Sequence, residues 1–279
     1  MLQIKKIRAF VLLILMFSAI VAFGQKDNTL AKKGIKLGKK GDFTSALECF
    51  EKSLKINPSN LNALYYKAYS LEQLEEFVKA IDAYSVAMKY KHDGAIYFRR
   101  GWCYFRVKNY DSALQDYNKA SEYLPDNDEI NMAKASVYLH TEKYQKLLDV
   151  LNSHLEKVPN DLFSKANKAI ALSKLNRNSE ALELFFELLS KMSVTQRHRV
   201  CNGIANTYML MKEYDKALEY IDKAFAYNSK YGAAHITKAE IFLALNKKSE
   251  ACKEIQKAKE LGVDMSDKDV KKVVERSEL

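Results

Sequence analysis

The sequence predicts an all-α fold built from about seven consecutive helix–turn–helix units. Three observations lead to this prediction. A stretch of 34 residues, 94–127, carries two successive helical patterns separated by a break. The same pattern returns along most of the 279-residue chain at nearly constant spacing. Only nine glycines and three prolines are present, which leaves little room for the turns of a β-rich fold.

The central unit, residues 94–127, shows how each helical pair is defined. Its first half places residues of one helical face three and four apart: Tyr97, Arg100, Gly101 and Tyr104. Lys108 and Asn109 interrupt the pattern, and a second one follows: Ala113, Tyr117, Ala120 and Leu124. Pro125 ends the second helix because proline lacks the N–H that a helix interior requires. Neither amphipathic helix can bury its apolar face alone, so the unit requires neighbours.

The neighbouring units are found by aligning the residue at the start of each second helix. The aligned residues are Phe43, Phe77, Tyr110, Tyr144, Asn178, Tyr214 and Lys248, at steps of 34, 33, 34, 34, 36 and 34. The prolines follow the same period, because Pro58, Pro125 and Pro159 are separated by 67 and 34 residues. The chain is therefore expected to be a repeat array.

The repeated pattern resembles the tetratricopeptide repeat family. That family places a small residue in the first helix, here Gly34, Ala68, Gly101, Ala135, Ala169, Ala205 and Ala239. It places alanine early in the second helix, which six of the seven units have, with Leu147 as the exception. Small residues allow the two helices of a unit to cross closely. The resemblance implies a right-handed α-solenoid.

The expected divisions follow the repeat spacing. They are a leader at 1–24, an array at 27–265 (27–60, 61–93, 94–127, 128–161, 162–197, 198–231 and 232–265) and a capping helix at 266–279. In the last segment Val270, Val273 and Val274 share one face, as a helix that covers the end of a repeat array requires. The lengthened junction near residues 191–197 predicts either an altered superhelical angle or a helix longer by half a turn. Five polar residues near the starts of the second helices are expected to cap them: Thr44, Asp111, Ser179, Asp215 and Ser249.

The first 24 residues have the layout of a secretory signal peptide. Lys5, Lys6 and Arg8 precede an apolar run of 15 residues, 9–23, and Ala22 and Gly24 fit a small-x-small cleavage site before Gln25. The run is shorter than the roughly 20 residues that span a bilayer. We therefore expect an exported protein, periplasmic or secreted. The alternative is an uncleaved signal anchor that tethers the array to the membrane.

Neither the composition nor the motifs of the sequence indicate catalysis, metal binding or nucleic-acid binding. The formal net charge is +10, but lysines and acids are mixed and no nucleic-acid-binding motif occurs, so no nucleic acid is expected as a partner. The five histidines form no metal-binding motif, and no phosphate loop or nucleophile elbow occurs. We expect no metal, no cofactor and no enzyme activity. The four cysteines, Cys49, Cys103, Cys201 and Cys252, are expected to be buried free thiols.

The resemblance also indicates where a partner would bind. In this family the first helices line a concave groove that holds ligands. The candidate partner-binding residues in the second and third repeats are Tyr65, Tyr69, Phe98, Arg99, Trp102, Phe105 and Arg106. Aromatic and arginine side chains commonly anchor interfaces, although the same rings could instead pack one first helix against the next. If the groove lies elsewhere, the next candidates are Arg199, Asn202 and Asn206.

The function that follows is a non-enzymatic scaffold of the cell envelope or secreted space. Its partner would be a protein that inserts a peptide or a helix into the concave groove, and the membrane would be involved only through an uncleaved leader. The alternative is a glycan- or small-ligand-binding accessory protein that uses the aromatic rings of the groove as stacking platforms.

Overall fold

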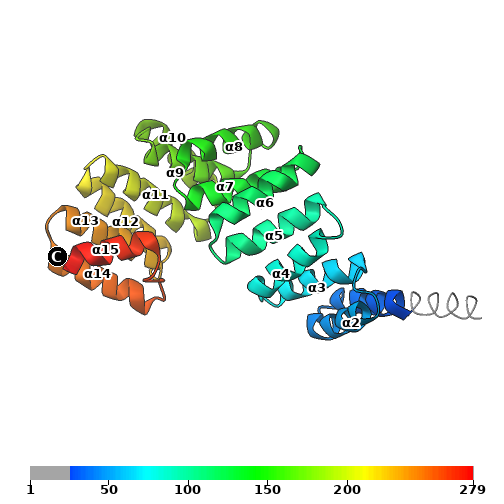
Figure 1. Ribbon diagram of the computed structural model, residues 1–279. Helices are drawn as coiled ribbons and strands as arrows, with labels where there is room; N and C mark the ends of the chain where they lie inside the picture. Colours follow the sequence, from blue (N-terminus) through cyan, green and yellow to red (C-terminus); the bar gives the residue numbers. More distant parts are fainter. Residues whose placement is uncertain (1–25, 279) are drawn as a thin grey trace, which may run out of the picture. The chain divides into compact units, whose positions relative to one another are not determined.

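The computed structural model describes residues 26–278, and these residues form helices and connecting turns without any strand. They divide into two compact units, one ending at Val137 and the other beginning at Tyr138 (Figure 1). The expected leader, 1–24, lies outside the described residues. Among residues 26–278, no helix is both long and apolar enough to cross a membrane.

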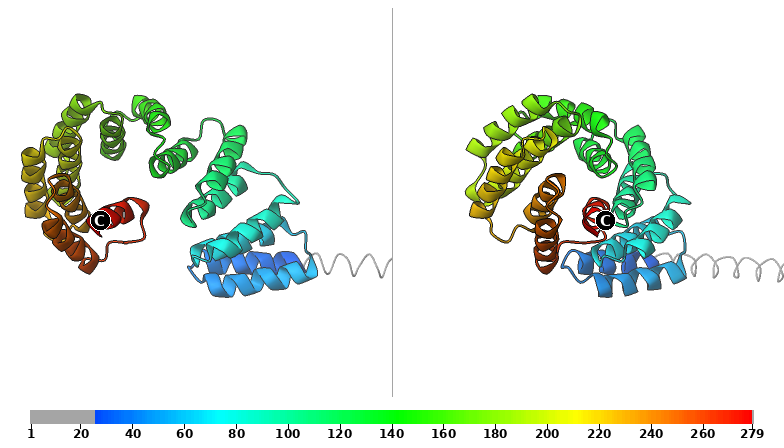
Figure 2. Two further views of the ribbon diagram at one scale, coloured as in Figure 1. Left: turned by 60° about the vertical axis from the view of Figure 1, so that its left-hand side comes forward. Right: turned by 90° about the vertical axis from the view of Figure 1, so that its left-hand side faces the viewer.

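The first unit consists of antiparallel helical pairs. After a helical segment at residues 26–38, its helices are α2 (Phe43–Ile56), α3 (Leu61–Gln73), α4 (Phe77–Met88), α5 (Gly94–Arg106) and α6 (Tyr110–Tyr123), and α7 (Asp128–His140) spans the boundary. Figure 2 shows successive pairs of this unit lying side by side. The all-α repeat fold expected from the sequence is confirmed.

The second unit continues the pattern and ends with a single helix. Its elements are α8 (Tyr144–Lys157), α9 (Leu162–Lys174), α10 (Asn178–Lys191), η1 (Val194–Gln196), α11 (Arg197–Leu210), α12 (Tyr214–Tyr227), α13 (Gly232–Ala244), α14 (Lys248–Glu260) and α15 (Lys268–Glu278). The lengthened junction holds the short 3-10 helix η1 instead of extending α10 by half a turn. The helix α15 buries Val270 and Val273, and Val273 packs against Ala239, Leu243 and Ala251 at the end of the array.

Each second helix begins at the residue that the sequence alignment used, from Phe43 in α2 to Lys248 in α14. The expected caps were wrong, because Thr44, Asp111, Ser179, Asp215 and Ser249 each lie one residue inside their helix. The residue before each helix is the true N-cap. In α2 the Asp42 side chain accepts a hydrogen bond from the Ser45 N–H, and in α6 the Asn109 side chain accepts one from Ser112.

Close packing within each pair depends on the small residues. The alanines that recur early in the second helices are fully buried, as are Ala68, Ala169, Ala205 and Ala239 of the first helices; the former are Ala46, Ala80, Ala113, Ala181, Ala217 and Ala251. At Gly101 an added Cβ would lie 2.8 Å from two ring carbons of Tyr117, which is itself buried. Such a distance is shorter than carbon atoms tolerate, so the Tyr117 ring fills the space that any larger residue at position 101 would need.

The four cysteines are free, as expected, but they do not all share one environment. Cys49, Cys103 and Cys201 are buried, whereas Cys252 is exposed on α14. The expectation of burial was therefore wrong for Cys252.

Candidate functional site

Three hollows lie between the first helices of successive pairs. One lies between the helical segment 26–38 and α3, one between α5 and α7, and one between α9 and α11. We call the faces of these first helices that border the hollows the first-helix surface, and describe it separately in each unit. The hollow beside α3 is small, about 120 Å³, and the other two are large enough to hold a side chain or a short segment.

The hollow in the first unit surrounds the only tryptophan of the chain and has a volume of about 370 Å³. Its lining comes almost wholly from three first helices: Glu72, Phe98, Arg99, Trp102, Glu129, Met132, Ala133 and Ser136. Trp102 is 38% exposed, and its ring stacks on Phe105 with a centroid distance of 5.8 Å. We call this hollow the Trp102 cavity.

Arg99 at the Trp102 cavity is neutralised within the chain. Its Nη1 atom donates to Oε1 of Glu72 at 2.9 Å, and its Nε atom donates to the Tyr65 hydroxyl at 2.9 Å. Glu72 also accepts a 2.7 Å hydrogen bond from the buried Tyr84 hydroxyl. Burial raises the pKa of Glu72, an effect that the bonds from Tyr84 and Arg99 oppose. Because Glu72 already balances the Arg99 charge, this cavity offers little attraction for a second carboxylate.

The seven candidate residues occupy different places around this network. Phe98, Arg99 and Trp102 line the Trp102 cavity together. Tyr65 turns inward, with its ring 6.1 Å from that of Tyr84, and burial raises the pKa of the Tyr65 hydroxyl. Tyr69 lies under the Arg99 guanidinium at 4.6 Å and borders the small hollow beside α3.

Phe105 and Arg106 flank Trp102 outside the cavity lining. The Arg106 guanidinium lies 4.4 Å from the centre of the Phe77 ring and 5.7 Å from that of Trp102. The structure therefore gathers three of the seven candidate residues into one cavity and arranges the other four around it. The pattern within one repeat does not show which residues of the neighbouring repeats face the ring, so five lining residues were not singled out from the sequence: Glu72, Glu129, Met132, Ala133 and Ser136.

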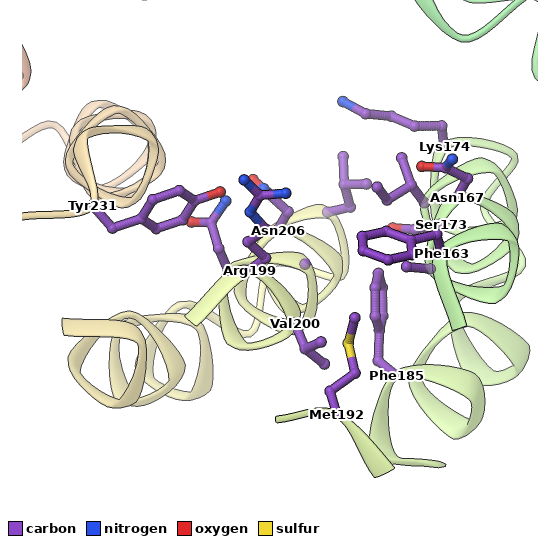
Figure 3. Close-up of a pocket in the computed structure, with 15 residues that line it drawn as sticks. Phe163, Asn167, Ser173, Lys174, Phe185, Met192, Arg199, Val200, Asn206 and Tyr231 are labelled. Carbon is purple, nitrogen blue, oxygen red and sulfur yellow. The ribbon is translucent and has the colours of Figure 1, made fainter. Parts of the chain in front are cut away.

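The hollow in the second unit has a volume of about 380 Å³ and an apolar floor (Figure 3). Phe185 of α10 and Met192, which follows that helix, form the base together with Val200 of α11. Figure 3 shows Phe163 of α9 above Phe185 on one side of the hollow. An added Cβ at Gly203 would lie 2.6 Å from two ring carbons of Phe185, so this glycine makes room for the floor. We call this hollow the Phe163 cavity.

The rim of the Phe163 cavity is basic and rich in amides. Arg199 and Lys174 stand on opposite sides of it, with the amides of Asn167 and Asn206 beside them (Figure 3). No ion pair of the described residues involves either cation, and no acidic residue lines the cavity. It therefore presents uncompensated positive charge above an apolar base, in contrast to the Trp102 cavity.

Two polar contacts fix the walls of the Phe163 cavity. The Thr207 hydroxyl donates to the Ser173 hydroxyl at 3.0 Å and so joins α11 to α9, across one repeat of 34 residues. Tyr231, at the start of α13, meets the His198 ring edge to face at a centroid distance of 4.5 Å. Burial raises the pKa of Tyr231. The sequence named Arg199, Asn202 and Asn206 as later candidates, and all three line this cavity.

The titratable side chains of the described chain do not assemble into a recognisable catalytic or metal centre. His154 contacts Asp161 at 3.0 Å, and His235 contacts Glu254, which also pairs with Lys257. Within residues 26–278 there is no group of three or more histidine, cysteine or acidic side chains placed to hold a metal ion. The arrangement is suited to holding a ligand between helices.

Family models described as tetratricopeptide repeats match residues 32–94, 94–127 and 198–231. Signal recognition particle subunit SRP72 from Homo sapiens is 23% identical over 189 residues, which cover 68% of this chain and 27% of that protein. The chain thus spans about a quarter of the length of this curated relative.

Solved structures agree on the fold. A tetratricopeptide repeat protein from Parabacteroides merdae has a TM-score of 0.73 and 20% identity, covering 91% of this chain and all of that one. YrrB, described as a tetratricopeptide repeat protein with an unusual peptide-binding site, has a TM-score of 0.56 and 21% identity, covering 67% of this chain and 96% of that one. The chain thus contains tetratricopeptide repeats, recognised over residues 32–127 and 198–231, within an all-α solenoid.

Proposed function

We propose that this protein is a non-enzymatic interaction scaffold that binds an extended segment or a helix of a protein partner along its first-helix surface. One observation carries the proposal: three hollows lie between first helices of successive pairs, whereas a fourth, more open one is lined mainly by the second helix α14 and lies outside this surface. Within the first unit two such hollows follow one another along the first helices, which suits a ligand that is itself extended. The peptide-binding site named for YrrB, a neighbour in fold, is consistent with this use of the repeat.

The two larger cavities would select different side chains of the partner. The Trp102 cavity offers aromatic faces, and its unpaired acid Glu129 favours an apolar or basic group. The Phe163 cavity offers an apolar base under Arg199 and Lys174, so it favours a bulky apolar side chain next to a carboxylate. A carboxylate of the partner is therefore expected to bind beside Arg199 and Lys174 rather than at Arg99, because Arg99 is already paired with Glu72.

The location of the protein forms part of the proposal. We place it in the cell envelope or the secreted space, because the apolar run at 9–23 and the small residues Ala22 and Gly24 have the layout of a cleavable leader. A retained leader would instead tether the same scaffold to a membrane.

Site-specific photocrosslinking tests which surface binds the partner. A benzophenone amino acid replaces Phe163 in one variant and Phe186 in another, in the cells that make the protein. Both rings are exposed, at 57% and 40%, but Phe163 lies on the first helix α9 and Phe186 on the second helix α10. We expect a discrete protein adduct from position 163 and none from position 186. Adducts from position 186 alone would place the interface on the second helices and contradict the proposal.

Once the partner is identified, the contribution of single side chains to its binding affinity can be measured. Trp102→Ala is expected to weaken its binding by roughly thirtyfold, the loss typical of an interface anchor. Val78→Ala, which removes a 66% exposed side chain from the second helix α4, is the control and should leave affinity unchanged. Circular dichroism verifies that both variants keep their helices. Unchanged affinity of folded Trp102→Ala would remove the Trp102 cavity from the site.

A different measurement distinguishes the glycan-binding alternative from the protein scaffold. It predicts no protein adduct from position 163 and binding to a soluble glycan array that Trp102→Ala abolishes. The exposed stack of Trp102 on Phe105 is the observation that keeps this alternative in view.

A further inference from the structure

The first helical segment carries a basic face that the interaction scaffold does not use. Residues 26–41 contain six lysines and a single acidic residue, Asp27. Lys32, Lys33, Lys36 and Lys40 are all exposed, and we call these four residues the lysine face.

The helix geometry places the lysine face opposite the packed side of the segment. Asp27, Ala31 and Gly34 are buried, and their spacing of three and four defines the side that meets the rest of the unit. At 100° per residue, Lys32, Lys33 and Lys36 lie on the other side of the helix, and Lys40 lies in the turn that follows the helix. Ala31 packs in a cluster with Ala46, Phe50 and Ala63, so the orientation of the helix is fixed by its core.

No neighbouring acid neutralises the lysine face. Asp27 is 1% exposed, and its carboxylate accepts hydrogen bonds from Asn57 at 2.8 Å and Asn60 at 3.1 Å. The two glutamates of α2 are engaged elsewhere, Glu48 with Lys52 and Glu51 with Lys67. Among the described residues, none of the four lysines takes part in an ion pair, whereas thirteen other lysines do.

The arrangement of these lysines matches a known kind of lipid contact. A group of four or more lysines gathered on one face of an amphipathic helix is a pattern that binds anionic lipid headgroups, each lysine contributing about 1 kcal/mol near the surface.

We propose that the lysine face docks the N-terminal end of the array onto an anionic phospholipid surface. Three ammonium groups on one side of the helix, with that of Lys40 in the turn that follows, can meet the headgroups together, while the opposite side of the helix stays packed in the unit. The interaction is electrostatic, so it weakens as salt shortens the screening length to about 10 Å or less. It is independent of the partner-binding cavities.

Vesicle co-sedimentation of the full chain tests the proposal. The probes are vesicles of phosphatidylcholine alone and vesicles in which about one third of the lipid is phosphatidylglycerol. The triple variant Lys32→Gln/Lys33→Gln/Lys36→Gln is compared with wild type on both. Glutamine has nearly the helix propensity of lysine, so the segment should remain folded, which circular dichroism verifies. The leader is the same in all chains, and phosphatidylcholine alone measures its apolar contribution.

The matched control is Lys157→Gln/Lys230→Gln/Lys259→Gln, which removes the same charge from exposed, unpaired lysines scattered over the second unit. We expect wild type and this control to prefer the anionic vesicles. The lysine-face variant should lose about a hundredfold in partitioning onto them, with no change on phosphatidylcholine. Equal losses in the two triple variants would show that net charge alone acts and would overturn the proposal. So would wild-type binding to duplex DNA without any preference for anionic vesicles.

Discussion

Gly101 shows how one side chain position determines the distance between two helices. It faces Tyr117 across the pair formed by α5 and α6, and the two ring carbons nearest to its missing Cβ would be 2.8 Å away. Gly38 occupies a helix in the first pair but has no neighbouring atom closer than 3.9 Å to an added Cβ. The same substitution at the two sites therefore separates a steric effect from helix propensity.

Gly101→Ala is expected to lower the free energy of unfolding by about 1–3 kcal/mol, because the added methyl would lie 2.8 Å from the ring of the buried Tyr117. Gly38→Ala should instead raise it by about 0.5–1 kcal/mol, since alanine loses less conformational freedom than glycine in a helix. Chemical denaturation of both variants measures the two effects. A stabilised Gly101→Ala variant would show that α5 and α6 do not approach at this point.

At the scale of the element, the turn within each pair has one recurring conformation. The residue two positions before each second helix adopts a positive φ: Gly41 at 83°, and Glu75, Lys108, Glu142, Asn176, Lys212 and Asn246 between 57° and 62°. Only the first of these is a glycine. The left-handed conformation is unfavourable for the others, so the packing of the two helices must hold it in place.

Gly41→Ala is expected to lower the free energy of unfolding by about 1 kcal/mol. No atom lies within 4 Å of the added Cβ, so the cost comes from the backbone conformation alone. Gly38→Ala, three residues earlier, is the control and should change stability in the opposite direction. If thermal or urea unfolding gave both variants the same sign, the turn conformation would not be the cause.

At the scale of the whole molecule, the repeat array depends on contacts between neighbouring pairs. The helical pairs are stabilised by contacts with adjacent pairs, as in other repeat proteins. α15 covers the apolar end of the last pair through Val270 and Val273. Each cavity lies between successive pairs of a single unit, so the proposed partner contacts can be tested in each unit separately.

The leader prediction is tested on protein extracted from the source cells. Cleavage after Gly24 should give a chain that starts at Gln25, because Ala22 and Gly24 fit the small positions of a cleavage site. Intact mass and N-terminal sequencing measure this directly. A chain that retains Met1 and fractionates with membranes would support the anchor alternative.

The sequence by itself determined the fold class and the starts of the second helices, since spacing of 33 to 36 residues follows from helix and turn lengths. The sequence also indicated Trp102 and Arg199 as candidate binding residues, but it did not show which charged side chains surround them. Only the tertiary structure pairs Arg99 with Glu72, 27 residues away, and leaves Arg199 without an acidic partner. It also turns Tyr65 toward the core while Trp102 remains exposed. Both outcomes depend on which side chains of neighbouring helices meet, a property that the repeat period does not contain.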